Sequence, residues 1–254
     1  MIIIKNHDEL EKMRLVGRVT AVICDAVVRN VVPGVSTQEI NHCAVELIKQ
    51  RGAKSAFLGY RGYPGVICVS INEEVVHGLP GPRRIQLGDI VSLDIGVVIG
   101  GFVGDMATTI MVGVSDLEII RLVTVTQQAL AAGIRQARVG NRLSDISAAI
   151  EQVATEAGFS VVRDFVGHGI GRTMHEDPQI PNFGPPGQGP VLRAGMTLAI
   201  EPMINMGGSS VDVQEDQWTV VTRDRRPSAH FEHTIAVGES EAEILTRAVE
   251  KRDN

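Results

Sequence analysis

The stretch Gly88–Thr109, GDIVSLDIGVVIGGFVGDMATT, constrains the fold most, because it places two aspartates in an otherwise apolar hairpin. A two-residue loop at Ile99 and Gly100 predicts that Asp94 faces Asp105, whereas a loop shifted by one residue makes them diagonal neighbours. In both registers two like charges lie close together on an apolar surface, which is destabilising. A bound cation would relieve the repulsion. The alternative is two unrelated surface aspartates on an amphipathic hairpin.

The composition is that of an ordinary globular chain of 254 residues, with 44% hydrophobic and 21% charged residues. No linker-like segment divides it, so we expect a single domain over residues 1–254. The net charge of −6, without a polybasic tail, argues against nucleic acid or an anionic membrane as the main partner. The three cysteines show no CxxC spacing, and neither a signal peptide nor a membrane-spanning stretch is recognised. These features predict a cytoplasmic protein.

Four amphipathic helices are predicted from capping residues that precede apolar residues at helical spacing. They are expected to begin after Asn6, Ser36, Ser115 and Ser144. Apolar positions of the second helix recur 106 residues later in the fourth, and GDIVSLD at 88–94 matches GMTLAIE at 195–201 with a shift of 107. Chance similarity of helices is the alternative, but the second shift also aligns Asp94 with Glu201. We expect an α/β domain of two pseudo-symmetric halves whose strand carboxylates meet.

The second half supplies further candidates for a site. His168 lies between glycines in FVGHGIG, where the backbone can approach a ligand closely. QWTVVT (217–222) and AHFEHTIAV (229–237) are expected to form another hairpin. On its second strand Glu232 shares a face with His230.

Four acidic residues in apolar strand contexts and one glycine-flanked histidine form a candidate metal-ligand set: Asp94, Asp105, Glu201, Glu232 and His168. Oxygen ligands with a single imidazole suit Mn, Fe, Co or Zn and do not suit a thiolate site. Four carboxylates carry a charge of about −4, which balances two divalent ions. Two such ions would lower the pKa of a bridging water to about 7. Metal-assisted hydrolysis is the expected reaction class.

Other chemistries fit the residues less well. The chain has no G-x-S-x-G elbow, and no cysteine lies in a recognisable nucleophile context. GHGIGR does not complete a dinucleotide-binding motif, and a glycosidase carboxylate pair leaves the histidine and the other acids unexplained. A non-catalytic binding module on the same scaffold stays open as a different class of function.

Five motifs, in order over essentially the whole chain, resemble those of type I methionine aminopeptidases. They are HGLPG, SLDIGVVIGGFVGDMATT, FVGHGIGRTMHEDPQIPNFG, TLAIEP and HFEHT. The resemblance implies the pita-bread fold, in which two pseudo-symmetric halves form a curved antiparallel sheet flanked by helices. It also implies removal of the initiator methionine from new polypeptides, favoured by a small second residue, with two divalent ions (Co, Mn, Fe or Zn).

The resemblance further implies how each ligand is used. Asp94 would chelate one metal ion. Asp105 and Glu232 would bridge both ions. His168 and Glu201 would complete the other site.

Catalytic and substrate-binding roles are implied in the same way. Glu201 would act as a proton shuttle, His175 would contact the scissile carbonyl oxygen, and His77 the substrate amide. The methionine side-chain pocket maps onto Phe57, Tyr60, Tyr63, Cys68, Met174 and Trp218. Phe57 stands where many type I enzymes have cysteine, and Met174 where phenylalanine is common, so the resemblance leaves the pocket width open.

Within the same fold, the Xaa-Pro peptidase and creatinase group is the alternative, since it shares the five metal ligands. Those enzymes generally carry an extra N-terminal domain, and type II methionine aminopeptidases carry a helical insertion. Neither is recognised here, nor is a zinc-binding extension, so the short form is expected. The expected partners are peptides beginning with methionine and, transiently, the ribosome; the protein is expected to be a monomer.

Overall fold

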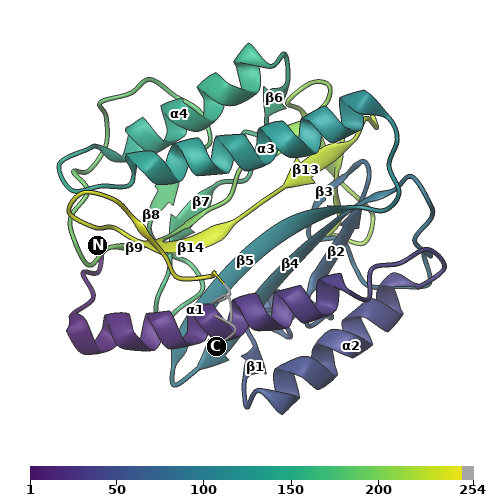
Figure 1. Ribbon diagram of the computed structural model, residues 1–254, viewed down its shortest axis with the longest axis horizontal. Helices are drawn as coiled ribbons and strands as arrows, with labels where there is room; N and C mark the ends of the chain where they lie inside the picture. The colour runs from purple at the N-terminus through teal and green to yellow at the C-terminus, as the bar shows by residue number, and fades with distance from the viewer. Residues whose placement is uncertain (248–254) are drawn as a thin grey trace, which may run out of the picture.

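Two helix pairs flank the strands in the computed structural model, which describes residues 1–247 (Figure 1). Helices α1 (His7–Val28) and α2 (Thr37–Gln50) pack on strands of the first half, and α3 (Leu117–Gln136) and α4 (Leu143–Glu156) pack on strands of the second. Each pair covers its own hydrophobic core. The expected architecture of helices flanking antiparallel sheets is confirmed, while residues 248–254 of the expected domain lie outside the described residues.

Every strand pair within the described residues is antiparallel, and two sheets supply the site. The first half holds β1 (Lys54–Ser55), the 3₁₀ turn η1 (Tyr60–Gly62), β2 (Cys68–Ile71), β3 (Glu74–Val76), β4 (Ile90–Ile99) and β5 (Phe102–Met111). The second half holds β6 (Ser160–Val161), β7 (Gly167–Gly169), β8 (Glu176–Ile180), β9 (Thr197–Ile200), β10 (Met203–Asn205), β11 (Val211–Val213), β12 (Val220–Thr222), β13 (Ser228–His230), β14 (His233–Ala236) and β15 (Glu243–Ile244). Strand β4 pairs with β1, β2 and β5, and β9 lies between β14 and β7.

Two of the four predicted helix starts are confirmed. Asn6 and Ser36 form capping boxes at the starts of α1 and α2. The other two predicted starts are wrong by one or two residues. Asp116, not Ser115, caps α3, because its carboxylate accepts hydrogen bonds from two backbone N–H groups and its charge suits the helix N-terminus. Ser144 lies one residue inside α4.

In the hairpin β4–β5, Gly100 and Gly101 form the loop, with φ of 58° and 78°. Both loop positions require positive φ, which two glycines adopt without strain. Asp105 therefore faces Gly96, and Asp94 lies diagonally across from it. The directly facing register is wrong, and the diagonal alternative is confirmed.

The expected hairpin between residues 217–222 and 229–237 is wrong. Strand β12 pairs with β11 and β3 instead, and the second predicted strand is divided into β13, which pairs with β10, and β14, which pairs with β9. The chain changes sheets at Glu232, whose backbone N–H donates to the Ala107 carbonyl of β5 at 2.9 Å. This hydrogen bond joins Glu232 to the first half of the molecule. A contact between such distant segments cannot be predicted from local sequence pattern.

The internal repeat has a structural counterpart. Helices α2 and α4 begin at Thr37 and Leu143, 106 residues apart, and β4 and β9 begin at Ile90 and Thr197, 107 residues apart. Equivalent elements of the two halves therefore follow the offsets seen in the sequence.

Helix α3 is long and apolar enough to cross a membrane by length and composition alone. The sequence was expected to hold no stretch of about 18 uncharged apolar residues, and α3 contains Glu118, Arg121 and Arg135. Its side chains Leu122, Leu130 and Ile134 are buried, and the helix packs against α4 and the strands of the second half. Core helices pass the same test, and burial explains the apolar composition of α3.

Candidate metal centre and active site

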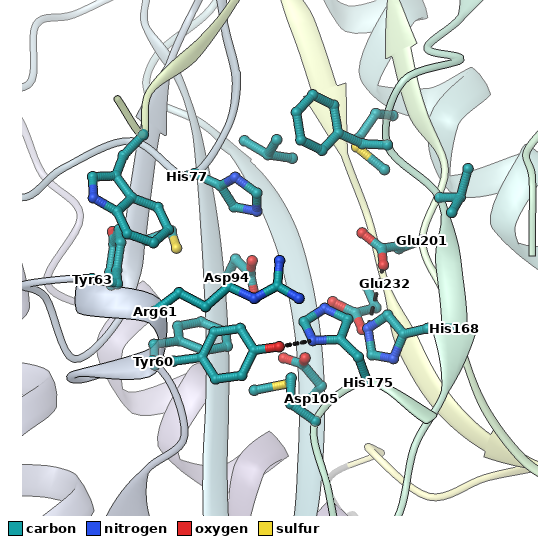
Figure 2. Close-up of a pocket in the computed structure, with 18 of the residues that line it drawn as sticks. Tyr60, Arg61, Tyr63, His77, Asp94, Asp105, His168, His175, Glu201 and Glu232 are labelled. Atoms are coloured by element: carbon teal, nitrogen blue, oxygen red, sulfur yellow. Dashed lines mark hydrogen bonds and ion pairs between the residues drawn. The ribbon is translucent and has the colours of Figure 1, made fainter. Parts of the chain in front are cut away.

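The five predicted metal ligands line one pocket of about 400 Å³ (Figure 2). Asp94 lies in β4, Asp105 in β5 and His168 in β7. Glu201 directly follows β9, and Glu232 lies between β13 and β14. Ligand atoms of Asp105, His168 and Glu232 lie within 4.8 Å of one another, and Nε2 of His168 lies 3.5 Å from Oε1 of Glu201. The structure thus brings all five together.

Three carboxylates of this cluster carry an oxygen without a partner. Within residues 1–247, Oδ1 of Asp94, Oδ1 of Asp105 and Oε1 of Glu232 are buried and accept no hydrogen bond. An unsatisfied buried polar atom costs about 1–3 kcal/mol, and more when it is charged. Such a cluster requires protons or a cation, and its free oxygens fit a divalent ion.

Burial raises the pKa of every carboxyl group in the cluster. The pKa values of Asp94, Glu201 and Glu232 lie well above the usual range, first because of desolvation and then because of neighbouring carboxylates. Desolvation also raises the pKa of Asp105 to about 7. Without a cation the cluster therefore retains protons near neutral pH, and a metal ion would displace them.

His168 is held in a neutral tautomer that can bind a metal ion. Its Nδ1 lies 2.9 Å from the carbonyl oxygen of Gly169. Because a carbonyl only accepts, Nδ1 carries the proton, and Nε2 presents its lone pair toward the carboxylates. Desolvation, followed by the nearby His175, lowers the pKa of His168 to about 4. The imidazole is therefore uncharged at pH 7.

The glycines on either side of His168 allow β7 to pack closely against its two neighbouring strands. A Cβ at Gly167 would collide with the carbonyl oxygen of Ala199, and one at Gly169 with that of Asp177. These glycines were expected to let the backbone approach a ligand; instead they let β7 lie close to β9 and β8. The close approach holds His168 beside Glu201.

Two further histidines of the expected site line the pocket. The Tyr60 hydroxyl lies 2.8 Å from Nδ1 of His175, and burial and then the nearby Arg61 lower the pKa of His175. The His77 ring packs edge-on against Phe165 at 5.5 Å between centroids, and burial lowers the pKa of His77 to about 4. Both imidazoles are neutral near pH 7, so each has one N–H to donate.

The expected methionine-pocket residues line the same cavity: Phe57, Tyr60, Tyr63, Cys68, Met174 and Trp218. The Tyr63 ring lies edge-to-face against Phe57 and Trp218, at centroid distances of 6.5 and 5.1 Å. A Cβ at Gly96 would collide with both Phe57 and Met174. Phe57 and Met174, the two residues that differ from the common type I residues, therefore pack against the same part of β4. Gly96 leaves room there for the larger ring of Phe57 and the flexible thioether of Met174.

Two residues near the ligand cluster were missing from the expected site. Nε2 of His230 is buried without a hydrogen-bond partner among residues 1–247, and it lies 3.6 Å from Oε2 of Glu201. His230 was expected to share a strand face with the predicted ligand Glu232, and this shared face could have indicated His230 from the sequence. Arg61 also lines the pocket, and its position beside Tyr60 in the sequence could have indicated it.

A buried ion pair fixes the segment that carries Met174 and His175. Glu176 accepts a hydrogen bond from Nζ of Lys5 at 2.5 Å and one from the backbone N–H of Arg172 at 2.8 Å. The side chains of Lys5 and Glu176 are only 3% and 4% exposed. The N-terminal segment therefore holds the pocket wall in place.

Replacing Lys5 with methionine should lower the free energy of unfolding by about 3–5 kcal/mol, because the Glu176 charge is left buried without its partner. Urea denaturation measures the loss. Arg14→Met is the matched control, since the pair between Arg14 and Glu243 is partly exposed and should contribute only about 0–1 kcal/mol. Equal losses in the two variants would contradict the assigned role of the pair.

Residues 11–239 match the family model described as metallopeptidase family M24. The chain belongs to metallopeptidase family M24. Methionine aminopeptidase 1 of Bacillus subtilis (strain 168) is a relative 49% identical over 247 residues, which cover 97% of this chain and 100% of the relative. The solved structure of a methionine aminopeptidase from Thermotoga maritima has a TM-score of 0.96 at 49% identity, covering 97% of this chain and 100% of that one.

A more distant solved structure shows the fold alone. The prolidase from Pyrococcus furiosus has a TM-score of 0.80 at 22% identity, and the match covers 97% of this chain and 66% of the prolidase. The expected resemblance to methionine aminopeptidases, the pita-bread fold and the hydrolase class are confirmed by these matches.

Membership of family M24 implies a divalent metal, and the donor set fits one. Carboxylate oxygens with one imidazole suit a hard or borderline ion. Cys68, which faces Asp94 across the β2–β4 pair, offers no thiolate, because burial and then Asp94 raise the pKa of its thiol. The pocket of this M24 metallopeptidase therefore presents oxygen and nitrogen donors.

Proposed function

We propose that this M24 metallopeptidase removes the N-terminal methionine from polypeptides, with preference for a small second residue. The observation that carries the proposal is the convergence of a buried carboxylate–imidazole cluster, two neutral histidines and a sulfur- and aromatic-lined wall in one pocket. Methionine aminopeptidases that match nearly the whole chain support it.

The pocket wall suits a methionine side chain. The rings of Phe57, Tyr63 and Trp218 surround a space next to the thiol of Cys68 and the thioether of Met174. A contact between a substrate thioether and an aromatic ring contributes about 0.3–1.5 kcal/mol. Methionine should therefore be preferred over leucine at the first position.

The five clustered residues would hold two divalent ions. Asp94 would bind one, Asp105 and Glu232 would bridge both, and His168 and Glu201 would complete the second site. When bound, such ions polarise a carbonyl group and acidify a water molecule. Co, Mn, Fe and Zn all suit these donors, and the metal supply selects among them.

The chain's own side chains would handle protons and the developing negative charge. Glu201, a carboxylate of the ligand cluster, would accept a proton from water and return it to the leaving amine. His175 would donate from Nε2 to the scissile carbonyl oxygen, and His77 to the substrate amide. The Tyr60 hydroxyl would donate to Nδ1 of His175, which keeps the other proton on Nε2.

Replacing Tyr60 with phenylalanine should lower kcat by about tenfold, because the supporting hydrogen bond to His175 is lost. KM for a Met-Ala peptide should change little, since the aromatic wall is retained. Steady-state kinetics measures both constants. A variant with unchanged kcat would contradict the role of Tyr60.

The proposed activity is tested by measuring methionine and leucine release from Met-Ala-Ser and Leu-Ala-Ser, with and without a chelator. Release of methionine alone, abolished by the chelator and restored by added Mn²⁺ or Co²⁺, is expected. Peptide binding without release would favour a binding module, and cleavage of Xaa-Pro peptides in place of Met-Ala-Ser would favour prolidase activity. Lower release from Met-Leu-Ser than from Met-Ala-Ser tests the small-residue preference.

We further infer that the protein works as a single-domain monomer in the cytoplasm, where it meets nascent chains near the ribosome. The net charge of −6 argues against specific binding to nucleic acid. Light scattering of the purified protein tests whether it is a monomer in solution.

A further inference from the structure

Arg61 is held in a backbone conformation that a non-glycine residue rarely adopts. It lies in η1 with φ of 49°, between Gly59 and Gly62, whose φ values are also positive. The left-handed conformation costs a residue with a Cβ roughly 1–2 kcal/mol. Strain of this kind persists where the surrounding structure and the function require the side chain in one place.

The conformation directs the guanidinium into the pocket. Figure 2 shows the Arg61 side chain extending from the wall that carries Tyr60 and Tyr63 toward His175. Its Cζ lies 5.5 Å from the centre of the Tyr60 ring, a cation–π contact, and the Tyr60 hydroxyl lies 2.8 Å from His175. Arg61 is therefore linked through one side chain to the histidine expected at the scissile carbonyl.

The charge of Arg61 is available to a ligand. In the part of the chain that the structure describes, Arg61 takes part in no ion pair, whereas Arg83, Arg163 and Arg172 pair with glutamates. Arg61 is exposed to solvent, and it is the one arginine or lysine among the pocket-lining residues within 1–247. Asp164, the other charged lining residue outside the metal cluster, does not pair with it.

We propose that Arg61 binds a carboxylate on the third residue of the substrate, and so favours peptides with an acidic third residue. The proposal rests on the proposed function, because a small second residue makes the third the first position able to carry an acid. An extended peptide advances about 3.3–3.6 Å per residue, so the third residue passes within reach of a side chain that lies beside Tyr60. The guanidinium fork matches a carboxylate.

The test compares kcat/KM for methionine release from Met-Ala-Asp-amide, Met-Ala-Ala-amide and Met-Ala-Lys-amide in the metal-loaded enzyme. A partly exposed ion pair predicts a ratio of about tenfold between the Asp and Lys peptides in the wild type, falling with added salt. Arg61→Ala should bring the ratio near one, Arg61→Glu should invert it, and Arg61→Lys should keep part of it. Arg121→Ala, on the outer helix α3, is the control and should keep the wild-type ratio.

Met-Ala-Ala with a free C-terminal carboxylate tests whether Arg61 binds a chain end as well as an acidic side chain. Faster release from this peptide than from its amide, lost in Arg61→Glu, would show that Arg61 also binds a chain end. A wild-type ratio near one, or a ratio unchanged in Arg61→Glu, overturns the proposal while leaving the proposed function intact. Failure to release methionine from all of these peptides would instead count against the proposed function itself.

Discussion

Replacing Glu232 with alanine should lower methionine release from Met-Ala-Ser by on the order of 10³-fold or more. Glu232 is buried between β13 and β14, and its Oε1 has no hydrogen-bond partner within residues 1–247. Loss of a bridging carboxylate would remove several kcal/mol of transition-state stabilisation, which corresponds to about that factor.

The fold should survive this substitution. Glu232 is tied to β5 through its backbone N–H, not its side chain, and the alanine variant removes a buried carboxyl group from a repulsive cluster. Circular dichroism and urea unfolding of the metal-free variant should match or exceed the wild type. Glu156→Ala, at the exposed end of α4, is the matched acidic control and should retain activity. Normal turnover by Glu232→Ala contradicts the bridging role.

Removing the metal should make stability fall as pH rises. Burial raises the pKa of Asp105 to about 7, and the pKa values of Asp94, Glu201 and Glu232 are raised as well. Unfolded carboxyl groups titrate near pH 4, so between about pH 4 and 7 these four carboxyl groups bind more protons in the folded protein than in the unfolded chain. The contribution of these groups is fully present below about pH 4 and is lost as pH rises through 7. We expect a loss on the order of a few kcal/mol.

Urea unfolding of chelator-treated protein at pH 5 and pH 8 measures this dependence. The midpoint should fall at pH 8, and added Mn²⁺ should reverse the trend, because metal binding requires the ionised carboxylates. Asp105→Asn should flatten the dependence, since the amide does not titrate there. A pH dependence in Asp105→Asn identical to that of the metal-free wild type would contradict the protonated cluster.

The metal-ligand part of the candidate site could be predicted because its residues lie inside local patterns, whereas the roles of His77, His175 and the pocket residues rested on the family resemblance. Asp94 and Asp105 stand in an apolar hairpin whose glycines mark the turn, and the repeat pairs Asp94 with Glu201. Capping residues located all four helices to within two residues. Periodicity and turn chemistry are local properties, so they survive without knowledge of the fold.

The features that could not be predicted depend on contacts between distant segments. The division of the last predicted strand at Glu232 follows from its bond to Ala107, and the neighbours of β12 are β3 and β11. Arg61 was not among the expected site residues, and its left-handed conformation and its cation–π contact with Tyr60 are seen only in the structure. Tertiary contacts of this kind override local pattern.

The most direct test of the metal centre is a calorimetric titration of anaerobically prepared, metal-free protein with Mn²⁺ or Co²⁺, read beside methionine release. We predict binding of two ions per chain, proton release on binding, and recovery of activity that follows occupancy. Asp105→Ala should bind fewer ions and remain inactive. If Asp105→Ala binds as many ions as the wild type, or if the wild type is fully active without bound metal, the carboxylate–imidazole cluster is not the catalytic centre.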